Sequence, residues 1–312
     1  MRETIRQTGR VDLRSAALHP LAGGYGGETF LLDVEGASSV VRVYARDPDR
    51  ALIDASLLQL MRGLVPVPEV LEVRPAYDGN PAVLVSQRLP GERLDLAMPH
   101  LDPQQRILMG RQLGRILARP SGVAQLRFGM FADDDLRLSR EALPAHDLTE
   151  WAHHFRDTGR LASWAPADWE GLLDILDQAE SLLADALPER FVLVHSDFNP
   201  KNLLVDSDTL DVTGVLDWEF AHAGSPYADL GNLTRFERHA DFVGAAVAGL
   251  LEQAPPLATD PLLLGRAADL WALVELAGSP RSNGVRRLAE GLLLAQAREA
   301  RSTGVAVAGS SR

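Results

Sequence analysis

The first ninety residues show a mainly strand-like pattern with one helical segment. Residues 29–34 and 39–44 are β-branched and apolar, and a short turn separates them. Residues 51–62 carry apolar positions at helical spacing, while residues 69–73 and 82–87 flank a segment rich in turn residues. The pattern predicts a small β-sheet accompanied by one helix.

Beyond Pro90-Gly91 the pattern becomes mainly helical, apart from a strand-like stretch at residues 191–216. Apolar spacing in this part predicts helices over residues 103–118, 147–160, 168–186, 228–251, 261–277 and 286–300. We therefore predict an α+β fold with two lobes. A sheet-rich N-terminal lobe covers residues 1–90, and a larger, mainly helical C-terminal lobe covers residues 91–301. Residues 302–312 are small and polar, which predicts a flexible tail.

Composition narrows the class of protein. The 312 residues contain 31 Lys and Arg, 43 Asp and Glu, and no cysteine, which gives a formal charge of −12. Without cysteine, disulfides, thiolate zinc sites and thiol nucleophiles are excluded. The acidic balance argues against nucleic acid as a partner, since phosphate-binding proteins concentrate positive charge. No signal peptide and no apolar run of membrane-spanning length is recognisable, so we expect a cytoplasmic protein without a membrane partner.

The negative charge is concentrated in the C-terminal lobe. Residues 1–90 hold 10 Arg against 11 Asp and Glu, whereas residues 91–312 hold 21 basic and 32 acidic residues. An acidic cleft there would concentrate a cationic small-molecule substrate. The alternative is an acidic surface that only keeps the protein in solution.

The strand-like stretch inside the helical half carries the candidate chemistry. Two apolar strands flank the polar turn 206–211, and antiparallel pairing about this turn brings Asn202 nearly opposite Asp217. Asp197 lies on the loop that leads into the first strand. Asn and Asp supply hard oxygen ligands, which suit Mg²⁺. The alternative for each residue alone is a turn or capping role, because both types are common in turns.

The motif His195-Ser-Asp197, followed by Asn202 and then by Asp217-Trp-Glu219, resembles the catalytic and metal loops of the aminoglycoside phosphotransferase and choline kinase superfamily. The resemblance implies a bilobal protein-kinase-like fold. It also implies that Asp197 orients the acceptor hydroxyl and takes its proton, while Asn202 and Asp217 hold Mg²⁺ against the nucleotide phosphates. By the same resemblance, His195 is a structural residue that steadies the loop.

A second segment, Gly224-Ser-Pro-Tyr-Ala-Asp229-Leu-Gly231, resembles the part of the same family that follows the metal aspartate. There an aspartate hydrogen-bonds back to the catalytic loop, so the resemblance gives Asp229 a supporting role. The alternative is that Asp229 only caps the first turn of its own helix.

The N-terminal lobe carries the expected nucleotide-binding residues. Five residues around Gly24 and Gly26 form a glycine-rich segment before a strand, where backbone N–H groups can approach phosphates. Arg42 stands at the position of the phosphate-binding lysine of kinases, and Asp54 stands where the family has its glutamate. We expect these two to form an ion pair that serves nucleotide binding. The alternative is an exposed strand arginine and an unrelated aspartate.

Residues 83–92 resemble the hinge between the two kinase lobes. Kinase hinges hold adenine through backbone groups, so the carbonyl of Gln87 and the N–H of Leu89 are the candidates. The resemblance extends from about Leu21 to Leu233.

These inferences predict a phosphotransferase that moves the γ-phosphoryl group of ATP (or GTP), with Mg²⁺, to a hydroxyl of a small molecule. The first candidate acceptor is an aminoglycoside or another cationic antibiotic, which would make the protein an antibiotic-resistance enzyme. The alternatives are a metabolic kinase for choline, an amino alcohol, an amino acid or a sugar, and a nucleotide-binding protein without turnover. The fold hosts many acceptors, so the choice rests partly on analogy.

Overall fold

The computed structural model describes residues 17–21, 28–34, 37–139, 147–186, 191–237, 239–253, 260–280 and 283–303. Packing divides the chain into two compact units. The first comprises Met1–Leu101, Met130–Ser139 and Pro200–His222, and the second comprises Asp102–Gly129, Arg140–Asn199 and Ala223–Arg312. The units follow packing and not chain order, so the lobe limits at residues 90 and 301 stay a prediction.

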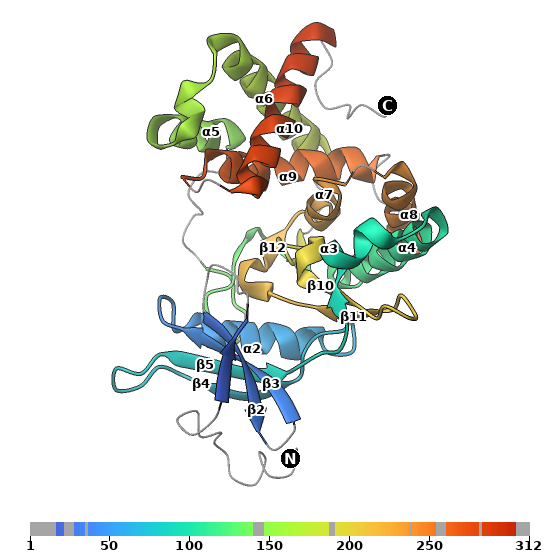
Figure 1. Ribbon diagram of the computed structural model, residues 1–312. Coiled ribbons are helices and arrows are strands. Elements are labelled where there is room, and N and C mark those ends of the chain that lie inside the picture. The colour runs from blue at the N-terminus through green and yellow to red at the C-terminus, as the bar shows by residue number, and fades with distance from the viewer. Residues whose placement is uncertain are drawn as a thin grey trace. The chain divides into compact units, whose positions relative to one another are not determined.

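A five-stranded antiparallel sheet forms the body of the first unit (Figure 1). Its strand order is β1-β2-β3-β5-β4, with bounds β1 Ala17–Pro20, β2 Glu28–Val34, β3 Ala37–Tyr44, β4 Val70–Arg74 and β5 Ala82–Gln87. Buried side chains of three neighbouring strands form its apolar cluster: Leu32, Val41, Val83 and Val85. Helix α2 (Arg50–Met61) packs against β4 and β5. The strands of the predicted sheet are confirmed, and β1 adds an edge strand.

The first unit also contains the predicted hairpin. Strands β10 (Leu203–Val205) and β11 (Val212–Val215) pair antiparallel, and β6 (Glu92–Arg93) extends them to a three-stranded sheet. The turn forms because the Asp206 carboxylate accepts hydrogen bonds from the N–H groups of residues 208 and 209, a typical aspartate turn. Short helical turns accompany this sheet: α3 Leu94–Ala97, η1 Met98–His100, η4 Pro200–Asn202 and η5 Trp218–Phe220.

Seven helices dominate the described part of the second unit. They are α4 Pro103–Ala118, α5 Leu148–Thr158, α6 Pro166–Ala186, α7 Ala228–Thr234, α8 Ala240–Leu251, α9 Pro261–Gly278 and α10 Gly284–Thr303. One core cluster joins buried residues of α5, α6, α9 and α10. Shorter elements are η2 Pro120–Gly122, β7 Ala124–Gln125, β8 Gly129–Met130, η3 Arg160–Ser163, β9 Phe191–Val194 and β12 His222–Gly224.

Helix α4 lies directly against α8, and small residues permit the close approach. A Cβ built on Gly114 would lie 2.0 Å from the carbonyl oxygen of Ala246, and one on Gly249 would lie 2.1 Å from that of Arg111. Glycine is therefore required at these contacts.

The single helix predicted over residues 228–251 is wrong, because the structure has two helices, α7 and α8, in this stretch. Arg235 ends the first helix and turns its guanidinium to the buried carboxylate of Asp269 on α9. The helical spacing of apolar residues is a local signal, so it could not predict an ion pair between residues so far apart in the sequence.

The α+β class with an N-terminal antiparallel sheet and a helical C-terminal part is confirmed. Among the described residues, none of the helices is long and apolar enough to cross a membrane.

Candidate active site

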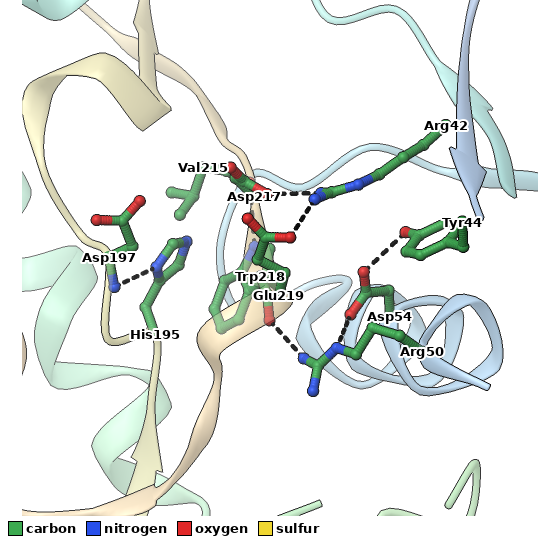
Figure 2. Close-up of polar contacts among 10 residues, drawn as sticks. All are labelled: Arg42, Tyr44, Arg50, Asp54, His195, Asp197, Val215, Asp217, Trp218 and Glu219. Carbon is green, nitrogen blue, oxygen red and sulfur yellow. Dashed lines mark hydrogen bonds and ion pairs between the residues drawn. The ribbon is translucent and has the colours of Figure 1, made fainter. Parts of the chain in front are cut away.

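The candidate catalytic loop begins where strand β9 ends. His195 is the first residue after β9 and is only 1% exposed. Its Nδ1 accepts a hydrogen bond from the backbone N–H of Asp197 at 3.2 Å (Figure 2). A buried imidazole in this position constrains the backbone that carries Asp197. This is the geometry expected of a structural histidine, while its role in the reaction stays a prediction.

Asp229 holds the same loop from helix α7. Its two carboxylate oxygens accept the backbone N–H groups of His195 and Ser196, each at 2.7 Å. The side-chain amide of Asn232, one turn further along α7, donates to the carbonyl of Ser196 at 3.2 Å. Ser196 has φ +69°, a backbone conformation that a residue other than glycine rarely adopts, so the loop needs these contacts.

Burial raises the pKa of Asp229 to about 6, although the hydrogen bonds from His195 and Ser196 oppose the shift. A nearby Asp197 raises the pKa further. Burial disfavours the charged form of this carboxylate, and the two N–H donors favour it. The two donors therefore stabilise the ionised form at neutral pH.

The side chain of Asp197 is half-buried, and the amide of Asn199 donates to its Oδ1 at 2.7 Å. The guanidinium of Arg235 lies close enough to interact electrostatically with Asp197 while it forms two 2.6 Å hydrogen bonds with Asp269. Burial alone would lower the pKa of Arg235, but these carboxylates outweigh burial and raise it. Asp197 therefore stands in a charged and ordered environment.

In the first unit, the open end of the β10–β11 hairpin presents Asn202 and Asp217. Leu203 is paired with Val215, and the carbonyl of Asn202 accepts the N–H of Leu216 at 2.8 Å. Asn202 thus faces Leu216, one residue before Asp217. The two oxygen-bearing side chains belong to neighbouring chain segments, as pairing about the turn predicts.

Arg42 of β3 bridges two carboxylates of the turn that follows β11. One terminal nitrogen of its guanidinium lies 2.6 Å from Asp217 Oδ1, and the other lies 2.5 Å from Glu219 Oε2 (Figure 2). The third nitrogen, Nε, is buried and has no hydrogen-bond partner within the described residues. The guanidinium also lies 5.3 Å from the ring centre of Tyr44.

The predicted ion pair between Arg42 and Asp54 is not formed, which corrects the sequence-based expectation. Asp54 accepts instead from Arg50 Nε at 2.6 Å and from the hydroxyl of Tyr44 at 2.7 Å. Arg50 precedes Asp54 by one helical turn, so the two meet on one face of α2. Both donors are closer to the short aspartate side chain than Arg42 is. Arg50 also donates a 2.8 Å hydrogen bond to the backbone carbonyl of Trp218.

Burial also raises the pKa of Glu219, to about 6, and the neighbouring Asp217 adds to the shift, whereas Arg42 opposes it. Asp217 and Glu219 in turn hold the pKa of the Arg42 guanidinium above its ordinary value, against the effect of burial. One cation between two carboxylates leaves this group with a net negative charge, which favours a further cation.

The donor set at the hairpin end fits Mg²⁺. Asn202 carries an amide oxygen, and Asp217 uses only Oδ1 to bind Arg42. No group of three or more His, Cys, Asp or Glu side chains suited to a metal occurs in the described part of the chain. A site with two protein oxygens agrees with the habit of Mg²⁺, which completes its coordination with water and substrate phosphate.

The remaining nucleotide-binding candidates divide in two. Gly24 and Gly26 lie outside the described residues. In the segment that resembles a kinase hinge, the N–H of Gln87 donates to the carbonyl of Glu69 at 2.8 Å, while Leu89 makes no hydrogen bond within the described ranges. The side chain of Leu89 packs against Gly214. A Cβ added to Gly214 would lie 2.9 Å from Leu89 Cδ1.

The structure reveals contributors that the sequence did not indicate: Tyr44, Arg50, Asn199 and Asn232. Glu219 belongs to the recognised motif, but its contact with Arg42 was not expected. Arg50 and Asn232 nevertheless had a local signal. Arg50 stands four residues before Asp54, a helical ion-pair spacing, and Asn232 stands three residues after Asp229 on the same helix face.

Comparison with known proteins identifies the family. The model of the phosphotransferase enzyme family matches residues 17–261. The chain belongs to this family and is a phosphotransferase, as predicted, and the acceptor group of this class is a hydroxyl.

Solved structures show the same fold. A thermostable mutant of aminoglycoside phosphotransferase APH(4)-Ia, in a ternary complex with AMP-PNP and hygromycin B, has a TM-score of 0.66 and 22% identity over 97% of this chain and 99% of its own. The microcompartment-associated aminopropanol kinase has a TM-score of 0.66 and 22% identity, with 96% and 98% covered. Macrolide 2'-phosphotransferase MphH from Brachybacterium faecium has a TM-score of 0.53 and 20% identity, with 97% and 93% covered.

Proposed function

We propose that the protein transfers the γ-phosphoryl group of ATP to a hydroxyl of a cationic small molecule, with Mg²⁺ as cofactor. The observation that carries this proposal is the pairing of Arg42 with the Asp217–Glu219 turn beside Asn202. This pairing supports the presence of a binding site for a divalent cation and for phosphate oxygens. Family membership supports the transfer reaction.

Asp197 is the proposed catalytic residue. Its carboxylate would hold the acceptor hydroxyl in line with the γ-phosphorus and accept the hydroxyl proton as the new O–P bond forms and the bond from the γ-phosphorus to the bridging oxygen breaks, which releases ADP. Asn199 fixes one oxygen of that carboxylate, and Asp229 holds the backbone of the two residues that precede Asp197. His195 and Asp229 are proposed as supporting residues.

The nucleotide is proposed to bind through several groups of the N-terminal part. Asn202 and Asp217 would hold Mg²⁺, which would neutralise the phosphate oxygens during transfer. Arg42 would add a second positive charge, and the segment with Gly24 and Gly26 would cover the phosphates. The backbone of the hinge at Gln87 and Leu89 would hold the base. Most of the rate enhancement would come from positioning and electrostatics.

We propose an aminoglycoside or another cationic antibiotic as the acceptor. Its support is the excess of 11 negative charges in residues 91–312, which favours a polyamine, and the likeness to a phosphotransferase bound to hygromycin B. A metabolic amino alcohol is the second candidate, favoured by the equal likeness to an aminopropanol kinase.

An acceptor panel read out by ADP release tests the proposal. The panel contains hygromycin B and other aminoglycosides, a macrolide, aminopropanol, choline and a sugar, each with Mg·ATP. Turnover of an aminoglycoside above the rest supports the first candidate, and preference for aminopropanol or choline supports the second. Thermal shift with ATP, with and without Mg²⁺, tests cofactor use. A protein that no Mg·ATP concentration stabilises would contradict the proposal.

The assignment of Asp197 has its own test. Asp197→Asn keeps the hydrogen-bonding shape but removes the base, so turnover falls by about a hundredfold or more, the range of general base catalysis. Binding of Mg·ATP stays close to that of the wild type. A variant with undiminished turnover removes Asp197 from the reaction.

A further inference from the structure

We propose that Glu219 is a positioning residue for nucleotide binding: it orients Arg42 toward the phosphates, the task that the helix glutamate performs in kinases. This inference rests on the proposed function. It assigns the partner of the phosphate-binding cation to the turn after β11, two residues beyond Asp217, and not to helix α2.

The first argument is that Asp54 is occupied. Both of its oxygens already accept a hydrogen bond, from Arg50 at 2.6 Å and from Tyr44 at 2.7 Å. Asp54 is 3% exposed, so no water is at hand to replace either donor. To reach Arg42, Asp54 would have to break a buried ion pair and leave Arg50 without its carboxylate, which is costly.

The second argument is geometric. Arg42 uses its two terminal nitrogens for two different carboxylates, Asp217 and Glu219, which fixes the plane of the guanidinium. The Glu219 side chain is 8% exposed and that of Arg42 is 14% exposed. Their contact is therefore shielded from solvent and holds the long arginine side chain in one conformation.

The third argument concerns the metal. Mg²⁺ bound to the second oxygen of Asp217 would weaken the attraction between this carboxylate and Arg42, since two cations would then share one negative charge. Glu219 is not among the proposed metal ligands. With Asp217 engaged by metal, Glu219 would still restrain Arg42, and the terminal nitrogen that now contacts Asp217 would become available to phosphate oxygens.

The backbone explains why the turn can perform both tasks. Asp217 has φ +63°, a left-handed conformation that aspartate tolerates better than most residues. The short helical turn η5 follows immediately, so Asp217 and Glu219 both face Arg42 (Figure 2). The hydrogen bond from Arg50 to the Trp218 carbonyl holds the middle of this turn.

Binding of AMP-PNP with Mg²⁺, measured by calorimetry, tests the proposal without an acceptor. For Glu219→Gln we expect an affinity for Mg·AMP-PNP that is about tenfold lower or worse, as expected when a charge-assisted partner is lost. Adenosine lacks phosphates, so its affinity should stay within about twofold of the wild type, a difference well under 1 kcal/mol. A merely structural defect would weaken both ligands.

Two further variants serve as comparisons. Glu72→Gln removes another paired glutamate of the first unit, whose partner is Arg74, and should leave Mg·AMP-PNP affinity unchanged. Asp54→Asn should lower the melting temperature but reduce nucleotide affinity less than Glu219→Gln does. If Asp54→Asn is the more damaging variant for Mg·AMP-PNP, the family arrangement holds and the proposal is wrong.

A magnesium titration, at an AMP-PNP concentration that saturates each variant, separates positioning from metal binding. Glu219→Gln should leave the Mg²⁺ concentration at half-saturation within about twofold, a small energy difference, whereas Asp217→Asn should raise it strongly. A large rise for Glu219→Gln would make Glu219 a metal ligand and overturn the positioning role. If the wild type itself binds no Mg·AMP-PNP, the proposed function fails; if it binds and Glu219→Gln binds equally well, only this inference fails.

Discussion

The guanidinium of Arg50 donates to the backbone carbonyl of Trp218 at 2.8 Å, which ties the first residue of α2 to the turn that carries Asp217. The same guanidinium pairs with Asp54 at 2.6 Å. A long side chain thus links a helix to a turn 168 residues later in the chain. Because all three groups are shielded from water, the contact should matter for stability as well as for the shape of the turn.

Replacing Arg50 should therefore be costly. Arg50→Met leaves the buried Asp54 carboxylate with one donor and frees the Trp218 carbonyl, so we expect a loss of about 3 kcal/mol in the free energy of unfolding, as for other broken buried pairs. Urea denaturation measures this loss. The double variant Arg50→Met/Asp54→Asn removes the unpaired charge and should recover part of the stability. A double variant no more stable than Arg50→Met would show that the ion pair is not the cause.

A second prediction concerns Asp229 and the catalytic loop. Asp229→Asn keeps one acceptor oxygen but turns an amide toward a backbone N–H, which should cost about 1–3 kcal/mol of stability at pH 7. Phosphotransfer should fall as well, because the backbone that carries Asp197 loses its support. Denaturation and the acceptor panel check the two effects. A variant with wild-type stability would remove Asp229 from the support of the loop.

The contribution of Asp229 to the free energy of unfolding should also depend on pH, because burial raises its pKa. Its pKa is about 6 in the folded protein against an ordinary value of 3.8 for aspartate, so the folded state binds the proton more tightly. The contribution of this group to stability is complete below pH 3.8 and is lost as pH rises through 6. The wild type should thus gain stability relative to Asp229→Asn between pH 7 and pH 5.

Asp241 provides the control for that experiment. A hydrogen bond from Arg106 lowers its pKa below the ordinary value, so its contribution changes only in more acidic solution. The difference in stability between wild type and Asp241→Asn should be constant from pH 7 to pH 5. A parallel drift in both comparisons would show that the pH effect is not specific to Asp229.

The close contact between α4 and α8 gives a further prediction. Gly114→Ala would place a Cβ 2.0 Å from one backbone atom of α8 and 2.6 Å from another, so the helices must separate. We expect a net loss of about 2 kcal/mol or more despite the gain in helix propensity. Gly244 is exposed on α8 with open space around it, so Gly244→Ala should instead stabilise by up to about 1 kcal/mol. Melting temperatures that shift in the same direction for both would contradict the packing argument.

Local patterns explain which parts of the structure could be predicted from the sequence. The strands of the sheet, helix α2 and the hairpin around residues 206–211 each follow from neighbouring residues, namely alternation, helical spacing and an aspartate turn. The partner of Arg42 could not be predicted in this way. Asp217 and Glu219 lie 175 and 177 residues away, and the choice between them and Asp54 depends on Arg50 and Tyr44. Competition among several buried charges is settled only by the packed structure.

Restoring the residues that kinases carry should therefore fail to restore the kinase arrangement. Arg42→Lys replaces a planar guanidinium that bridges two acids by a single point charge, so we expect affinity for Mg·AMP-PNP to fall about tenfold, the loss of roughly one charge-assisted contact. In Arg42→Lys/Asp54→Glu the new glutamate still faces Arg50 and Tyr44, which hold it as they hold Asp54. Calorimetry should find the double variant as weak as the single one. Recovery to within about twofold of the wild type, a difference below 1 kcal/mol, would show instead that helix α2 supplies the partner of this cation as soon as the side chain is long enough.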